Sequence, residues 1–323
     1  MKGLTEYSSY IENAIKNLTL PTDTLPSLYE PIVYGLDGGG KRIRPLLTLM
    51  TCDAFHGNIE KALNAAIGLE MFHNFTLLHD DVMDNSDLRR GRPTVHKRWD
   101  KNTAILSGDT MLTLATELIT DVDDHKLRTV LNTFNRMAID VYEGQQIDMD
   151  FEQRNDVCIE EYIRMITGKT SALLGCAAQI GAIIAGASEE DCSRMYDFGV
   201  ALGLAFQIQD DYLDLYGDAL TFGKPIGGDI LNDKKSFLPL TALNIVPKEK
   251  SGELNTILAM SPSEDKINIV RNFFTQIGVP QSCEITIDKY SKKAAEMISN
   301  TKMSDSGKND FYSLIEKLIN RKK

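Results

Sequence analysis

Two short segments of the sequence carry the pattern DDxxD: LHDDVMD, which ends at Asp84, and IQDDYLD, which ends at Asp214. On a helix, residues four apart lie on one face, so Asp80 pairs with Asp84 and Asp210 pairs with Asp214. Carboxylate ligands without histidine or cysteine suit a hard cation, and Mg²⁺ is usually shared between one or two carboxylates and the phosphates of a substrate. The spacing therefore predicts Mg²⁺ as the cofactor, bound by these two pairs of carboxylates.

An isolated acidic cluster is more often a solvated helix face than a metal site. Here each cluster follows an apolar and aromatic run, FHNFTLL before the first and VALGLAF before the second, so the carboxylates end helices that are otherwise buried. Like charges four residues apart destabilise a helix by roughly 0.2–0.5 kcal/mol per pair. A doubled motif with this repulsion indicates a positively charged ligand, and a metal site is the favoured interpretation.

Basic residues cluster at four places in the sequence. They are Lys41, Arg42 and Arg44; Arg89, Arg90 and Arg92; Lys169; and Lys224, Lys234 and Lys235. The arginine fork matches phosphate oxygens bidentately, and lysine adds a compact charge beside them. The first cluster lies in the glycine-rich stretch GLDGGGKRIRP, which fits most of a nucleotide-binding P-loop. However, Arg42 stands where that motif needs a hydroxyl for Mg²⁺, and no clear strand precedes it, so we expect this stretch to bind a diphosphate rather than a nucleotide.

The bulk properties exclude several classes of protein. The 323 residues include 42% hydrophobic ones, enough for a sizeable core, and a net charge of −11 argues against nucleic-acid binding through a general basic field. Five scattered cysteines without CxxC spacing predict neither a disulfide framework nor a zinc site. No apolar run reaches the roughly 18 to 20 residues of a membrane span, and the start is too polar for a signal peptide, so we expect a cytoplasmic protein.

Long helices must position these residues, because apolar residues recur at helical spacing along nearly the whole chain. Examples are Leu46, Leu47, Met50 and Ala54, or Leu173, Leu174, Ala177 and Ala178. Strand-like alternation is scarce, and the longest loops are expected at residues 85–100 and 217–236. Without a repeat, a low-complexity tract or a linker, the pattern predicts one all-α domain over residues 1–323, built as a single large helical bundle.

On these motifs, the sequence resembles the trans-isoprenyl diphosphate synthases of the polyprenyl synthetase family over essentially its whole length. The matching motifs, in the family's order, are GGGKRIRP, LLHDDVMDNSDLRRGRPTVH, GQQID, GKT, FQIQDDYLD and GKPIGGDILNDKK. The resemblance implies an all-α fold of the isoprenoid synthase type, usually a homodimer, with the two aspartate motifs facing each other across a deep central pocket. It also implies a prenyltransferase of isoprenoid biosynthesis that condenses isopentenyl diphosphate with allylic diphosphates and binds several Mg²⁺ ions.

Position by position, the resemblance implies a role for each motif residue. The isopentenyl diphosphate site is implied for Lys41, Arg44, His73 and Arg90. The metal ligands are implied to be Asp80, Asp84, Asp210 and Asp214, with Asp81 in support. The allylic diphosphate is implied to contact Arg89, Lys169, Thr170, Gln207, Lys224 and Lys234. The catalytic residues are implied to be Asp80, Asp81, Asp84, Lys169, Asp210 and Lys224.

Two further positions complete the implied site. His73 lies seven residues before Asp80, about 20° away on an ideal helix, so it shares the face of the carboxylates. The basic tail at residues 320–323 resembles one that closes over isopentenyl diphosphate in some members of the family.

The implied reaction needs no protein nucleophile. Positive charge from Mg²⁺, lysine and arginine stabilises the diphosphate as the allylic C–O bond ionises, and the double bond of isopentenyl diphosphate then attacks the allylic cation. In the family, the departing diphosphate is the usual base for the proton that is lost. This agrees with a sequence that needs no Ser-His-Asp or Cys-His arrangement.

Product length in this family depends on the residues just before the first motif, where a bulky side chain forms the floor of the pocket. The fifth position before Asp80 is Phe75 and the fourth is Thr76, which resembles short-chain enzymes that make farnesyl or geranylgeranyl diphosphate. Ideal helix geometry places Thr76 on the carboxylate face but Phe75 about 140° from Asp80, so Phe72 is a second candidate for the floor. We expect geranylgeranyl diphosphate slightly ahead of farnesyl diphosphate, with a long-chain polyprenyl diphosphate synthase as the alternative.

Three other interpretations are weaker. A terpene cyclase would typically carry an Asn/Ser/Glu pattern in place of DDYLD. A non-catalytic helical partner subunit of an active synthase would have lost some metal-binding or basic positions, and all of them are present. A calcium-binding protein would carry a DxDxDG-type loop, which the sequence lacks. The sequence therefore favours a short-chain prenyl diphosphate synthase.

Overall fold

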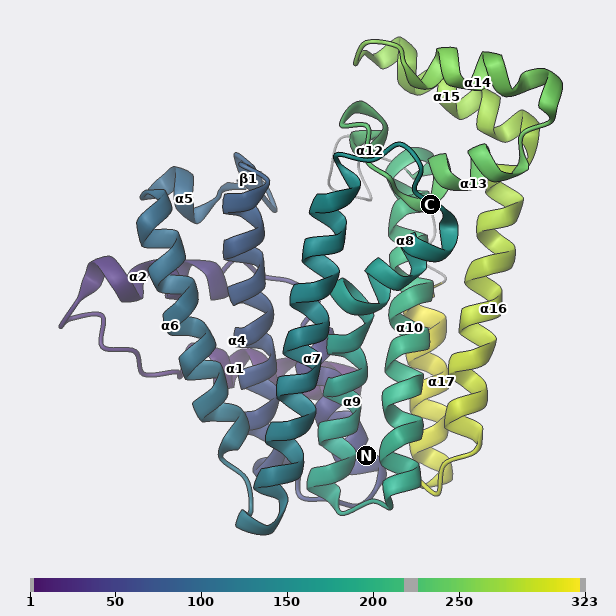
Figure 1. Ribbon diagram of the computed structural model, residues 1–323. Coiled ribbons are helices and arrows are strands. Elements are labelled where there is room, and N and C mark those ends of the chain that lie inside the picture. The colour runs from purple at the N-terminus through teal and green to yellow at the C-terminus, as the bar shows by residue number, and fades with distance from the viewer. Residues whose placement is uncertain (1–2, 218–225, 320–323) are drawn as a thin grey trace. The chain divides into compact units, whose positions relative to one another are not determined.

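The computed structural model describes residues 3–217 and 226–319, and helices make up most of them (Figure 1). The helices up to residue 185 are α1 (Leu4–Lys16), α2 (Pro26–Leu36), α3 (Ile43–Ala54), α4 (Ile59–Met83), α5 (Val95–Arg98), α6 (Lys101–Thr120), α7 (Asp124–Phe151), α8 (Ile159–Ile166), η1 (Thr167–Ser171) and α9 (Ala172–Ala185). The later ones are α10 (Glu189–Tyr216), α12 (Gly228–Leu231), α13 (Phe237–Ile245), η2 (Lys248–Lys250), α14 (Ser251–Leu258), α15 (Glu264–Ile277), α16 (Val279–Ser299) and α17 (Asp305–Ile319). In the described part of the chain, the strands are β1 (Leu88–Arg89) and β2 (Arg92–Pro93), which pair as a small antiparallel hairpin. The predicted all-α class is confirmed.

The chain divides into two compact units. Unit 1 consists of Met1–Arg136, Leu173–Tyr196 and Thr301–Asn309, and unit 2 consists of Met137–Ala172, Asp197–Asn300 and Asp310–Lys323. Helices α7, α10 and α17 each run from one unit into the other. The first aspartate motif belongs to unit 1 and the second to unit 2, while the single domain expected from the sequence stays a prediction.

Helix α4 carries the first aspartate motif, and its sequence explains why it is buried. Asn58 caps its start by accepting a hydrogen bond from Glu60 N at 2.9 Å. Apolar residues then follow on every face of the helix, a pattern that suits a helix with neighbours on all sides. Gly68 lets α6 approach closely, because a Cβ there would lie 2.7 Å from Ile119 Cγ1. Helices α4 and α6 therefore pack side by side in unit 1 (Figure 1).

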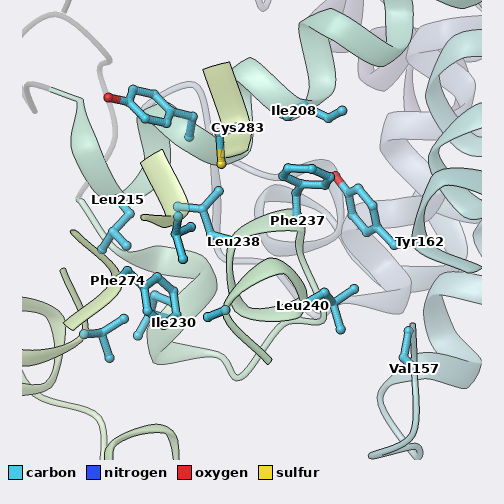
Figure 2. Packing of buried hydrophobic residues seen from close by; sticks show 14 of the residues in the cluster. Val157, Tyr162, Ile208, Leu215, Ile230, Phe237, Leu238, Leu240, Phe274 and Cys283 are labelled. Carbon is cyan, nitrogen blue, oxygen red and sulfur yellow. The ribbon is translucent and has the colours of Figure 1, made fainter. Parts of the chain in front are cut away.

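Helix α10 carries the second aspartate motif and ends in the core of unit 2. Ser188 caps its start by accepting a hydrogen bond from Asp191 N at 3.1 Å. Towards its C-terminal end, Ile208 lies in a buried apolar cluster with Tyr162 and Phe237 (Figure 2). Burial of each large side chain contributes about 1.5–3 kcal/mol, so this cluster fixes the part of α10 that bears the motif.

Residues 31–34, directly before the glycine-rich stretch, lie inside α2, so the strand that a P-loop needs is missing there, as the sequence indicated. Another segment differs from what the sequence suggested. The segment Ile159–Ala185 does reach the length and composition of a membrane span, with a mean hydropathy of 1.2, although no such run was expected. In that window 67% of the residues are buried inside the protein, which is the behaviour of a core helix.

Candidate active site

The glycine-rich stretch at residues 35–45 joins α2 to α3 through a sharp turn. Gly39 and Gly40 adopt φ angles of 73° and 135°, and Arg42 has a φ of 47° directly before α3 begins. A positive φ costs a residue with a side chain about 1–3 kcal/mol, so other contacts must hold Arg42 in place. Lys41, the predicted ligand in this turn, is exposed.

A buried carboxylate holds Arg42. The guanidinium donates to Glu70 Oε1 at 2.9 Å and to Glu12 Oε1 at 3.0 Å. It also donates to Leu36 O at 2.6 Å, at the end of α2. Glu70 is 2% exposed, and breaking a buried pair of this kind is strongly destabilising. Glu70 was not predicted as part of the site, because its signal in the sequence is a single carboxylate inside the apolar part of α4.

Three of the four residues predicted to bind isopentenyl diphosphate come together in unit 1. Burial, helped by the charges of Arg44 and Arg90, lowers the pKa of His73 well below its usual value. Burial and, to a smaller extent, the charge of Arg90 together lower the pKa of Arg44 to about 10. Arg90 sits at the turn of the β1–β2 hairpin and donates to Gly39 O, which joins the hairpin to the turn that carries Lys41. That this cluster binds isopentenyl diphosphate stays a prediction.

In the first aspartate motif, the protein itself binds the middle carboxylate. Asp81 is 4% exposed and accepts hydrogen bonds from Arg89 Nε at 2.8 and 2.9 Å. Arg89 Nη2 also donates to Asp80 Oδ2 at 3.1 Å. Burial raises the pKa of Asp81, and the ion pair with Arg89 opposes that rise. Asp81 thus anchors Arg89, while Asp80 and Asp84 stand one turn apart at the end of α4.

A pocket opens in unit 1 next to the β1–β2 hairpin. Its lining includes Tyr34, Asn74, Asp81, Arg89, Arg90 and Arg92. Tyr34 is braced, since its hydroxyl donates to Pro93 O at 2.8 Å and the guanidinium carbon of Arg92 lies 4.0 Å from its ring centroid. Three arginines in one concave lining suit an anionic ligand such as a diphosphate.

In the second aspartate motif, the middle carboxylate is again buried and bound by the protein. Asp211 is 7% exposed and accepts hydrogen bonds from Tyr162 Oη at 2.5 Å and from Phe237 N at 2.9 Å. Gln207 Nε2 donates to its other oxygen at 3.0 Å. Burial and, to a smaller extent, the negative charge of Asp229 together raise the pKa of Asp211 to about 7. Tyr162 and Phe237 were not predicted as parts of the site, because only the folded chain brings them to Asp211.

The segment after α10 returns to the second motif. Asp210 and Asp214 lie one turn apart near the end of α10, and Asp229 N donates to Asp214 Oδ2 at 3.0 Å. Lys234 N donates to Asp229 O at 3.0 Å, and the residue is exposed. Lys224 and the basic tail at residues 320–323 lie outside the described residues.

Lys169 and Thr170 lie in η1, a π-helical turn of unit 2. Such turns are rare and frequently mark functional sites. Gly144 of α7 packs against this turn so closely that a Cβ would lie 2.2 Å from Lys169 N. Lys169 Nζ pairs with Asp148 Oδ2 at 2.6 Å, and Thr170 Oγ1 donates to Gln207 Oε1 at 3.2 Å. The sequence did not single out Asp148, although it stands one turn after Gly144 in the GQQID motif.

The carboxylates fit Mg²⁺ that arrives together with a diphosphate. Among the residues that the structure describes, no three His, Cys, Asp or Glu side chains gather as a metal site. Each motif instead offers a pair of carboxylates one helical turn apart. Mg²⁺ keeps several waters and is usually bound by one or two carboxylates plus substrate phosphates, so pairs of this kind are sufficient.

The residues predicted to limit product length belong to a row of aromatic rings in unit 1. Phe75 is 5% exposed, and its ring centroid lies 5.4 Å from that of Phe72. Phe72 in turn meets Phe134 at 5.2 Å. Thr76 is half-buried and donates from Oγ1 to His73 O at 2.7 Å. Both candidates for the floor, Phe72 and Phe75, are therefore neighbours in one packed row.

Comparison with known proteins gives the family of this chain. The Polyprenyl synthetase family matches residues 25–275. The geranylgeranyl diphosphate synthase of Sulfolobus acidocaldarius is 35% identical over 332 residues, which cover 100% of this chain and 100% of that protein.

Solved structures agree with this relationship. A crystal structure of a geranylgeranyl pyrophosphate synthase has a TM-score of 0.94 at 44% identity and covers 100% of both chains. The geranylgeranyl pyrophosphate synthase of Corynebacterium glutamicum, crystallised with isoprenyl diphosphate and magnesium, has a TM-score of 0.82 at 26% identity, over 99% of this chain and 96% of that chain. The predictions of an isoprenoid synthase fold and of a prenyl diphosphate synthase type are confirmed, and the chain belongs to the polyprenyl synthetase family.

Proposed function

We propose that this protein is a Mg²⁺-dependent prenyltransferase that makes short all-trans prenyl diphosphates. It condenses isopentenyl diphosphate with dimethylallyl, geranyl or farnesyl diphosphate, and its product is geranylgeranyl or farnesyl diphosphate. The observation that carries this proposal is the division of roles within both aspartate motifs. In each motif the protein buries and binds the middle carboxylate, whereas the outer two stand one helical turn apart.

Isopentenyl diphosphate binds to Lys41, Arg44, His73 and Arg90 in this proposal. Arg44 stays charged at neutral pH, because its lowered pKa of about 10 is still well above 7. His73 stays neutral, because burial and the surrounding arginines lower its pKa. It can therefore donate a hydrogen bond to a phosphate oxygen without the cost of burying another positive charge.

The allylic diphosphate binds to Arg89, Lys169, Thr170, Gln207, Lys224 and Lys234. When bound to Asp80, Asp84, Asp210 and Asp214, Mg²⁺ supplies positive charge that stabilises the leaving diphosphate. Arg89 and Lys169 are held by the carboxylates of Asp81 and Asp148 before the substrate arrives. Because these two side chains are already in place, little free energy is spent on reorienting them when charge develops on the leaving group.

The bond changes follow from this arrangement. The allylic C–O bond breaks, and its electron pair leaves with the diphosphate. The double bond of isopentenyl diphosphate then forms the new C–C bond to the allylic cation, and the departing diphosphate accepts the proton that is lost. The chain's own residues bind and orient both diphosphates in these steps, and none of them serves as a nucleophile.

We also propose that Phe75 and Thr76 limit the product to a short chain. The alternatives to a short-chain synthase are a long-chain polyprenyl diphosphate synthase and a non-catalytic partner subunit. The supporting observation is that Phe75 is buried in the aromatic row next to the first motif.

We infer a homodimer in the cytoplasm. Two successive apolar side chains on α6, Ile105 and Leu106, are 41% and 58% exposed, and a second copy of the chain would cover them. The apolar segment Ile159–Ala185 is mostly buried within the protein, as in a core helix, which supports the cytoplasmic location.

Light scattering tests the dimer. It should give the mass of a dimer for the wild-type protein and of a monomer for Leu106→Glu. A wild-type monomer would contradict the inference.

The decisive assay supplies purified protein with Mg²⁺, labelled isopentenyl diphosphate and, in separate reactions, dimethylallyl, geranyl and farnesyl diphosphates. We expect a labelled geranylgeranyl or farnesyl product that disappears when EDTA removes the metal. Chains much longer than these would favour the long-chain alternative. No condensation with any primer would favour the non-catalytic subunit.

A further inference from the structure

His79 lies directly before the first aspartate motif, yet its side chain contacts α6. Its Nε2 is 3.1 Å from Ile105 O and 3.7 Å from Asp109 Oδ1. Because a backbone carbonyl only accepts hydrogen bonds, Nε2 carries a proton and donates it to Ile105 O. This bond ties the ring to the backbone of the neighbouring helix.

The ring of His79 fits there only because residue 108 is glycine. A Cβ on Gly108 would lie 2.3 Å from His79 Nε2 and 2.5 Å from His79 Cδ2, distances that real Cβ atoms do not show. A glycine inside a helix costs stability relative to alanine. The interior of α6 carries this cost at the one point where the ring needs the space.

The same ring also packs against Phe75. The centroids of His79 and Phe75 lie 4.8 Å apart with the planes at 67°, the edge-to-face arrangement that aromatic rings favour. Phe75 contacts Phe72 at 5.4 Å, and Phe72 contacts Phe134 at 5.2 Å. His79 is thus the member of the aromatic row that is hydrogen-bonded to α6.

We propose that His79, seated against Gly108, is a positioning residue that holds Phe75 in place and thereby limits the length of the product. Removal of the ring would leave a cavity beside Phe75, and a large side chain next to a cavity can move into it. The floor of the pocket would then retreat, and chain growth would stop later. This inference rests on the proposed function and adds a determinant that acts through Phe75 rather than on the substrate.

The test compares the product lengths of wild-type protein, His79→Ala and Gly108→Ala, each with Mg²⁺, labelled isopentenyl diphosphate and a dimethylallyl or farnesyl primer. We expect both variants to shift the main product by at least one isoprene unit. The KM for isopentenyl diphosphate should stay within about twofold, because neither change touches Arg44, His73 or Arg90.

A variant with both His79→Ala and Gly108→Ala tests whether the two residues act through their contact or independently of each other. In His79→Ala the space beside residue 108 is empty, so a methyl group there meets no ring. The variant with both changes should therefore give the same product lengths as His79→Ala alone, which is the signature of coupled sites. Additive lengthening would overturn the proposal.

Gly68→Ala is the matched control, because it introduces a clash between the same two helices at another point. Its Cβ would lie 2.7 Å from Ile119 Cγ1 and 2.8 Å from Ala115 O. This variant should lower the melting temperature and keep the wild-type product lengths. Longer products from Gly68→Ala would show that general separation of α4 and α6 is the cause, and the proposal would fail.

The outcomes distinguish this inference from the proposed function. If the wild-type protein condenses no primer, the proposed function is wrong. If it condenses them but His79→Ala leaves the lengths unchanged, only the role of His79 is wrong. Should Gly108→Ala not fold, the comparison of His79→Ala with Gly68→Ala still decides.

Discussion

Asp81 and Asp211, the middle aspartates of the two motifs, share the same kind of environment: each is less than 10% exposed and is bound by protein donors. Arg89 binds Asp81 through Nε at 2.8 and 2.9 Å, and Tyr162 donates to Asp211 at 2.5 Å. The pattern DDxxD therefore contains one scaffold residue between two residues that stand one turn apart. Changes at the middle aspartate or its partners should lower mainly the stability of the fold, whereas changes at the outer aspartates should lower mainly turnover.

The scaffold role of Asp211 is tested by Tyr162→Phe. The change removes one donor from a buried carboxylate, so we expect the free energy of unfolding to fall by about 1–3 kcal/mol. Turnover should fall by about tenfold or less, because Gln207, which is bonded to Asp211, loses part of its support. Urea denaturation and the condensation assay measure the two effects. The half-buried Tyr312→Phe in α17 is the control, and an equal loss of stability there would argue against a special role for Tyr162.

The buried carboxylate under the glycine turn is tested by Glu70→Gln. This change leaves Arg42 without its buried counter-charge and should cost about 3 kcal/mol of unfolding free energy. The KM for isopentenyl diphosphate should rise, because the turn carrying Lys41 loses its anchor. Glu60→Gln changes an exposed carboxylate on the same helix and should cost less than about 1 kcal/mol. Similar losses for both variants would refute the role of Glu70.

The lowered pKa of His73 predicts a dependence of stability on pH. In the folded chain, burial and the neighbouring arginines keep the imidazole neutral, whereas in the unfolded chain it takes up a proton near its ordinary pKa of 6.5. Stability from this group is therefore fully present above about pH 6.5 and is lost as the pH falls below it. We measure the free energy of unfolding by denaturant at several pH values between 5 and 8. Its slope against pH should be smaller for His73→Gln than for the wild-type protein.

The control for the pH series is His125→Gln, which changes an exposed histidine and leaves the basic cluster intact. It should reproduce the wild-type slope. A wild-type slope in His73→Gln would show that the histidine is charged in the folded protein as well.

The role of Phe75 as the floor is tested by Phe75→Ala. The cavity should lengthen the product and lower the free energy of unfolding by about 3–5 kcal/mol. Phe273→Ala, in the core cluster of unit 2, should lower stability by a similar amount without a change in product length. Chromatography of the labelled products measures their length. An unaltered length in Phe75→Ala would show that another residue forms the floor of the pocket, and Phe72 would be tested next.

Sequence patterns were sufficient for the fold class and the motifs. Helical spacing predicted the all-α class, and the run from Phe72 to Leu78 predicted that the first aspartates end a buried helix. These features could be predicted because they depend on neighbours within one helix.

Other features depend on which helices meet, and sequence spacing does not contain that information. Asp80 and Asp81 are the same residue type, and only the position of Arg89 shows how their contacts differ. Arg42 looked like a phosphate ligand, but its positive φ and its bond to Glu70 make it part of the turn. The contact of His79 with Gly108 likewise requires knowledge of how α4 packs on α6.

The most direct test of the proposed function is to measure turnover and melting temperature together for Asp80→Ala, with the exposed Asp197→Ala as the control. We predict that turnover of Asp80→Ala falls by at least about 10²–10³-fold, as expected when a charge-stabilising interaction at the leaving group is lost. Its melting temperature should change little, because the relief of repulsion with Asp84 offsets the lost contact with Arg89. Wild-type turnover in this variant would contradict the assignment of Asp80 as a metal ligand.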